Sequence, residues 1–124
     1  MDAIAVRYSK VQEVTKTIDL AKFRKEMEEY PGHPERFDKI DIEHADFDED
    51  SNLEMLIDYD DGTDLLVKTY QEDEWTWVPS LCDLDGAELD NEQMAKMFGS
   101  DDEASEVYDM ICYLTDYLLK ETRK

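Results

Sequence analysis

The chain has 124 residues, of which 34 are acidic and 13 basic, and its formal net charge is −21. A single compact domain spanning residues 1–124 is expected, because this length builds one core but not two. The charge argues against direct binding to nucleic acid or anionic lipid, since both are polyanions. No apolar run approaches the roughly 20 residues of a membrane span.

The N-terminal part predicts a strand followed by a helix. Apolar residues alternate over 3–10, which is typical of a strand, and weaker alternation continues through 11–17. Asp19 is placed to cap a helix, with Ile18 and Phe23 as a hydrophobic staple across the cap. The expected buried stripe of this helix is Leu20, Phe23, Met27 and Tyr30, and Pro31-Gly32 ends it.

The middle of the chain predicts an antiparallel meander of about four strands. Three of them show alternating apolar residues, and Asp61-Gly62 is a strong hairpin signal between the second and the third. A short fourth strand is expected to stop at Pro79. The expected strands cover residues 40–43, 53–59, 65–70 and 75–78.

Two C-terminal helices are expected to pack on the sheet. Asp90 and Gln93 fit a capping box, and Gly99 is a C-terminal stop signal. The last helix should bury Val107, Ile111, Leu114 and Leu118, which follow helical spacing. The predicted fold class is therefore α+β.

The sequence lacks the common catalytic and nucleotide-binding motifs. Four glycines cannot supply a glycine-rich phosphate loop, and His33 and His44 lie too far apart for an HExxH motif. A calcium loop with Gly62 at its sixth position would put Ile57 and Tyr59 at the first and third ligand positions. We therefore expect no enzyme, no cofactor and no specific metal site. Weak, unspecific binding of Mg²⁺ or Ca²⁺ in the acidic loops stays open.

The two cysteines indicate the compartment. Cys82 and Cys112 form no metal or redox motif, and a domain of this size does not need a disulfide. A cytoplasmic protein with reduced thiols is expected.

The negative charge is concentrated in one segment. Residues 1–37 hold seven acids and seven bases, whereas residues 38–64 hold twelve acids and one base, Lys39. A protein adapted to high salt would be expected to spread acids over its whole surface. A concentrated acidic segment instead favours an interaction surface.

The acidic segment predicts a carboxylate ladder. Alternate residues of a strand face the same way, about 6.8 Å apart, so Asp41 and Glu43 should share a face, extended by Glu54 and Asp58 on the neighbouring strand. This spacing is close to that of successive phosphates in nucleic acid. A solvated sheet face is the simpler interpretation, but residues 40–64 contain no Lys or Arg. The candidate partner-binding acids are Asp41, Glu43, Asp46, Asp48, Glu49, Asp50, Glu54, Asp58, Asp60, Asp61 and Asp64.

Aromatic residues complete the candidate surface. Trp75 and Trp77 share one face of the fourth strand, flanked by acids, and would serve as anchors if they are exposed rather than in the core. In size, charge and acidic sheet-plus-helix architecture the chain resembles the small acidic inhibitors of phages and mobile elements. These include anti-restriction DNA mimics, anti-CRISPR proteins and uracil-DNA glycosylase inhibitors. The resemblance includes no sequence motif, so it transfers no functional residues.

The function expected from these features is protein binding. The leading hypothesis is an inhibitor, a nucleic-acid mimic, that occupies the basic nucleic-acid-binding groove of a host defence protein. An immunity protein or antitoxin that neutralises a basic nuclease toxin is the alternative, and a salt-adapted accessory domain is a further one. The chain is expected to act as a monomer or homodimer.

Overall fold

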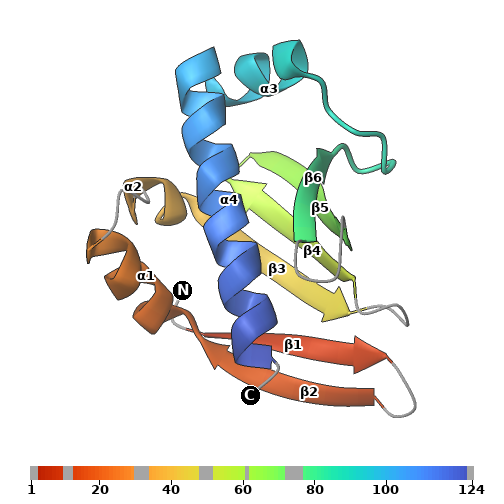
Figure 1. Cartoon of the computed structure of the whole chain (residues 1–124). Coiled ribbons are helices and arrows are strands. Elements are labelled where there is room, and N and C mark those ends of the chain that lie inside the picture. The colour runs from red at the N-terminus through yellow and green to blue at the C-terminus, as the bar shows by residue number, and fades with distance from the viewer. Residues whose placement is uncertain are drawn as a thin grey trace.

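The computed structural model describes residues 3–9, 13–29, 34–47, 52–60, 62–71 and 77–122. These residues form a six-stranded sheet with helices packed on it (Figure 1), which confirms the predicted α+β class. The strands are β1 (Ala3–Ser9), β2 (Glu13–Asp19), β3 (Ile40–Phe47), β4 (Leu53–Tyr59), β5 (Thr63–Gln71) and β6 (Trp77–Cys82). The helices are α1 (Leu20–Glu29), α2 (Pro34–Phe37), α3 (Asn91–Phe98) and α4 (Asp101–Thr122).

The sheet is larger than the predicted meander, and it is mixed. Its strand order is β2-β1-β3-β4-β5-β6, and β3 to β6 form the expected antiparallel run. β1 and β2 form a hairpin beside this run, and β1 pairs with β3 in parallel. The predicted antiparallel meander of about four strands is therefore present as β3 to β6, whereas the parallel pairing of the N-terminal strand β1 with it was not predicted. The reason lies between β2 and β3, where the chain crosses over through α1 and α2, and such crossovers allow parallel pairing.

The last strand continues past Pro79, which was expected to end it. Pro79 lies inside β6 and pairs in register with Thr69 of β5. Proline has no amide hydrogen to donate, so it is tolerated on an edge strand, where one side of the backbone has no partner strand. β6 is the last strand of the sheet order, and this position explains the error.

A bulge in β3 sets which of its side chains face the core. The pairing register between β3 and β4 shifts between Ile42 and His44, so Glu43 is the extra residue. Ile42 is buried, Glu43 and His44 are both exposed, and Ala45 is buried again. The bulge thus keeps apolar residues on the core side of the strand and acids on the other side.

The two faces of the sheet differ in what covers them. The core face is packed against the helical layer, with α4 lying across it (Figure 1). Val6, Met55, Ile57, Leu65 and Val67 are completely buried there. In the described part of the chain, no helix covers the opposite face, which we call the open face.

Local signals place α3 and α4 as predicted. Asp90 and Gln93 form the capping box of α3, and Gly99 ends this helix with φ of 112°. The predicted stripe of α4, Val107, Ile111, Leu114 and Leu118, is completely buried. No helix among the described residues is long and apolar enough to cross a membrane.

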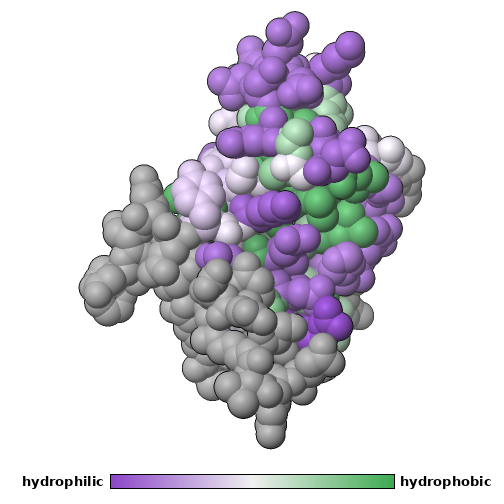
Figure 2. Space-filling model, turned by 90° about the vertical axis from the view of Figure 1, so that its right-hand side faces the viewer, coloured by the Kyte–Doolittle hydropathy of each residue, from purple (hydrophilic) through white to green (hydrophobic). Residues whose placement is uncertain are grey.

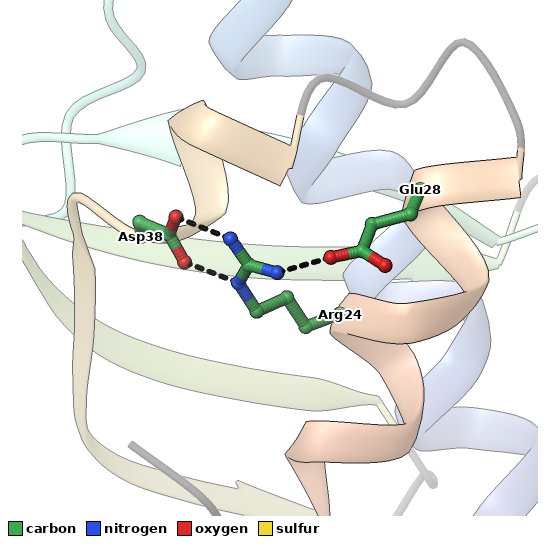
Figure 3. Close-up of polar contacts among 3 residues, drawn as sticks. All are labelled: Arg24, Glu28 and Asp38. Atoms are coloured by element: carbon green, nitrogen blue, oxygen red, sulfur yellow. Dashed lines mark hydrogen bonds and ion pairs between the residues drawn. The ribbon is translucent and has the colours of Figure 1, made fainter.

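The junction of α1 with the rest of the fold is held by an arginine fork. The Asp19 side chain accepts a hydrogen bond from the Ala21 amide at 3.0 Å, as predicted for a cap. Arg24 then donates to both carboxylate oxygens of Asp38, at 2.7 and 2.8 Å, and lies 2.5 Å from a Glu28 oxygen (Figure 3). This fork ties α1 to the start of β3.

Helix α4 is fixed to both neighbouring helices. Tyr117 donates its hydroxyl to the Asp19 carbonyl at 2.7 Å, and its ring lies against Phe23 of α1. Arg36 of α2 donates to Glu106 of α4 at 2.8 and 2.9 Å. The helical layer is therefore held by specific polar contacts as well as by the core.

Candidate protein-binding surface

One end of the open face gathers acids from three neighbouring strands. Asp41 of β3 lies directly opposite Asp58 of β4, and Asp58 lies directly opposite Asp64 of β5. Strands in a sheet lie about 4.7–4.9 Å apart, so these carboxylates form a short row across the sheet. The bulge adds Glu43, and the turn after β4 adds Asp60. We call these five residues the acidic corner: Asp41, Glu43, Asp58, Asp60 and Asp64.

The hairpin turn holds the acidic corner in shape. The Asp58 carboxylate accepts a hydrogen bond from the Gly62 amide at 3.0 Å. Asp60 has a left-handed φ of 54°, a conformation that aspartate tolerates better than most residues, and its amide donates to the Lys39 carbonyl at 2.8 Å. The acids are therefore presented by ordered backbone.

No cation of the described residues compensates this charge. None of the five acids has a Lys, Arg or His group within ion-pair distance in the described ranges, and Lys39, the nearest base in sequence, forms no ion pair there either. Like charges directly opposite each other on a sheet are destabilising. The acidic corner is therefore a place where binding an external cationic group would relieve repulsion.

Three of these acids come close enough to share one cation. Oxygen atoms of Glu43, Asp58 and Asp64 lie within 4.8 Å of one another. Ca²⁺ in proteins takes six to eight oxygen ligands and Mg²⁺ usually keeps several waters, so an exposed trio of carboxylates is only a partial ligand set. Exposed acidic groups of this kind are common without an ion. By charge alone, these three carboxylates could bind a metal ion or a cationic side chain equally well.

The other end of the open face is charge-balanced. Arg7 of β1 lies 3.2 Å from Asp46, and His44 lies 3.9 Å from the same carboxylate. Glu54 is the register partner of Asp46 on one side and of Lys68 on the other. The predicted ladder along β3 and β4 is therefore split, because Glu54 lies opposite Lys68 and away from the acidic corner.

The middle of the open face is apolar. Leu56 and Leu66 are register partners on β4 and β5, and both are half-buried with no helix above them. They lie in the row of residues between the acidic corner and the charge-balanced row. An apolar centre with a charged rim is the usual anatomy of a protein-binding surface.

Some of the candidate residues fall outside the described ranges. Of the candidate acids, Asp48, Glu49, Asp50 and Asp61 lie there, and so does Trp75. Trp77 begins β6, but its side chain is not among those described. The role of both tryptophans as anchors stays a prediction.

Sequence reasoning missed three residues of this surface. Arg7 forms an ion pair with Asp46, Lys68 lies opposite Glu54, and Tyr70, 53% exposed, is an aromatic side chain on the open face. Alternation along β5 places Lys68 and Tyr70 on the same face as Asp64, so their position on this face could have been predicted from the sequence. Arg7 could not be found in this way, because its neighbour Asp46 follows from the parallel pairing of β1 with β3.

The two cysteines lie on different elements, Cys82 opposite Leu66 at the end of β6 and Cys112 on α4. Cys82 is buried and Cys112 partly buried, and both are free. Burial raises the pKa of the Cys112 thiol above its ordinary value, which disfavours the reactive thiolate.

Comparison of the chain with protein-family models, with curated proteins and with solved structures finds no match.

Proposed function

We propose that the chain is a protein-binding inhibitor that presents its open face to the basic nucleic-acid-binding groove of another protein. The observation that carries the proposal is the acidic corner, a set of carboxylates beside Leu56 and Leu66 with which no cationic group of the described residues forms an ion pair. Arg and Lys side chains that grip phosphates would find comparable negative charge there.

The two parts of the surface would contribute differently. The charge of −21 attracts a basic partner from a distance and raises the association rate. Leu56 and Leu66 then lose water against the partner, and such desolvated contacts slow dissociation. The resulting complex is expected to be tight at low salt and to weaken as salt rises.

The test uses the purified chain as bait in a lysate at low salt, beside two variants of equal charge. One variant reverses the acidic corner by Asp41→Lys, Asp58→Lys and Asp64→Lys. The control reverses three exposed acids of the helices by Glu29→Lys, Glu92→Lys and Asp109→Lys. Both change the formal net charge of the chain by the same six units.

The expected result is a basic protein retained by the bait and by the control but lost from the corner variant. We expect its affinity to fall at least about tenfold on corner reversal, because attraction becomes like-charge repulsion. Equal losses in both variants would mean unspecific charge attraction. Mimicry is wrong if the retained protein still binds DNA and RNA at full affinity while in the complex. The identity of the retained protein then decides between the two candidate partners, a host defence protein and a nuclease toxin.

A further inference from the structure

A second binding feature lies in the helical layer, away from the open face. A groove of about 610 Å³ runs between the start of α4, the start of α3 and the loop that precedes α3. Figure 2 shows this end of the molecule at the top, where hydrophilic residues of α3 and α4 dominate, with hydrophobic residues gathered below. The groove shares no residue with the acidic corner.

The floor of the groove is apolar. Leu89 and Ala104 are buried at its base, and Met94 and Tyr108 are half-buried beside them. Met94 is unbranched and flexible, so it can adapt to side chains of different shapes. A floor of this kind suits an aliphatic side chain of moderate size.

The rim of the groove is acidic. Glu88 and Asp101 both line it and are exposed, and its described lining residues include no Lys or Arg. An apolar floor between two carboxylates has the charge and polarity of a site for an apolar side chain flanked by Lys or Arg.

The walls are pre-organised. The Asp83 carboxylate accepts hydrogen bonds from the Asp85 and Ala87 amides, both at 3.0 Å, and the Leu89 amide donates to Leu81 of β6 at 2.8 Å. These bonds fix the loop that carries Glu88. Binding would therefore cost little loop ordering.

The floor is pre-organised as well. Tyr108 donates its hydroxyl to the Pro79 carbonyl at 3.1 Å, which clamps its ring. On the opposite wall, the capping box of Asp90 and Gln93 fixes the start of α3. The groove thus exists before any ligand arrives.

We propose that this groove binds a lysine- or arginine-rich peptide segment of a protein partner through one apolar anchor side chain. The proposal stands on the groove alone and holds whether or not the acidic corner mimics nucleic acid. It gives the chain two separate surfaces for basic partners, one a flat sheet face and one a groove.

The experiment titrates the whole chain with a short oligolysine peptide that carries one central leucine. Binding is followed by the NMR signals of the Met94 and Ala104 methyl groups. The same peptide with serine in place of leucine is expected to bind about tenfold more weakly or worse, because it cannot bury an apolar side chain. It should leave the two methyl signals nearly unshifted. The proposal is overturned if both peptides bind equally and shift the same signals.

Variants of the rim provide the matched control. Glu88→Gln with Asp101→Asn should weaken the leucine peptide about tenfold at low salt, by loss of two favourable charges. Glu92→Gln with Asp102→Asn removes two exposed acids, one of α3 and one of α4, that do not line the groove, and should change binding less than about threefold. Equal losses in the two pairs would overturn the groove as the site.

Two further variants separate this proposal from the first. Ser105→Trp places a large ring in the groove from an exposed helical position and should abolish the leucine-dependent shifts, with circular dichroism confirming the fold. The corner variant Asp41→Lys, Asp58→Lys, Asp64→Lys should keep those shifts. If the corner variant loses them and Ser105→Trp keeps them, the peptide binds the open face instead.

Discussion

Two regions of the molecule treat their carboxylates in opposite ways. We call the first the anchored side, defined by Asp19, Arg24, Arg36, Asp38 and Tyr117, where each carboxylate or carbonyl meets a donor from another element. The second is the acidic corner, where the described residues supply no cation. The chain pairs its acids where the fold depends on them, and it leaves the acidic corner without a described cationic partner on a face that no described helix covers.

This difference separates structural charge from charge available to a partner. Removing a polar group from the anchored side should lower stability, because its partner is left unsatisfied. Removing a charge from the acidic corner should raise stability, because repulsion is relieved. The opposite signs make the comparison testable without knowing the partner.

The largest expected effect is at Arg36. The guanidinium bonds Glu106 and lies 4.0 Å from Glu103, and its side chain is 15% exposed. Its hydrogen bond to Glu106 raises the pKa of Arg36. Arg36→Leu should lower the free energy of unfolding by about 1–2 kcal/mol, measured by urea unfolding, since hydrogen bonds to charged groups exceed neutral ones. The free energy of unfolding of Arg36→Lys should lie between those of the parent chain and Arg36→Leu. An unchanged free energy of unfolding in Arg36→Leu would contradict the difference between the anchored side and the acidic corner.

The next effect is at Tyr117. Tyr117→Phe removes the hydroxyl that donates to the Asp19 carbonyl and should cost about 1 kcal/mol in urea unfolding at pH 7. Tyr113→Phe is the control, because Tyr113 on the same helix is 41% exposed and should change stability little. Equal losses in both variants would argue against the Asp19 contact.

Tyr117 also makes a pH prediction. Burial, with Glu121 nearby, raises the pKa of Tyr117 to about 12, above its ordinary value of 10.0. The folded state therefore favours the neutral phenol, so this stabilisation is present below pH 10 and is lost as pH rises toward 12. Tyr117→Phe should therefore lose less of its free energy of unfolding between pH 10 and pH 12 than the parent chain does. Burial also raises the pKa of Tyr108 to about 12, so part of the loss should remain.

The acidic corner carries the prediction of opposite sign. Asp64→Asn should raise the free energy of unfolding by about 0.2–1 kcal/mol at low salt, because Asp58 lies directly opposite. The gain should nearly vanish in 1 M salt, where the screening length is about 3 Å. Glu54→Gln is the matched control on the same face, since Glu54 lies between Asp46 and Lys68, whose effects oppose each other, and its stability should change little. A gain in both variants would show only the effect of lowering the net charge.

Local signals made most of the fold predictable. The capping box at Asp90, the stop at Gly99 and the stripe of α4 depend on neighbours within a few residues, so the sequence contains them completely. Pro79 shows the limit, because whether proline is tolerated depends on its strand being an edge. The parallel pairing of β1 with β3 was equally inaccessible, since it depends on how the chain crosses over.

The candidate surface was predictable in content but not in arrangement. Counting charges located the acids, and alternation placed Asp41 and Glu43 on one face. Strand register decides which acids meet, and it placed Asp58 between Asp41 and Asp64 but Glu54 beside Lys68. The bulge at Glu43 could have been predicted, because two polar residues, Glu43 and His44, interrupt the alternation of β3.

The smallest expected effect is a titration at Asp38. Hydrogen bonds from Arg24 hold the pKa of the Asp38 carboxyl below its ordinary value of 3.8. A lowered pKa favours the charged form in the fold, so this contribution is present above pH 3.8 and is lost as pH falls through the lowered pKa. NMR titration of Asp38 in Arg24→Gln should show its pKa moving up toward the ordinary value, while Lys25→Gln, a neighbouring exposed lysine of α1, should leave it nearly unchanged. If both variants move it equally, general charge rather than the fork sets this pKa, and the anchored side would then differ from the acidic corner in degree only.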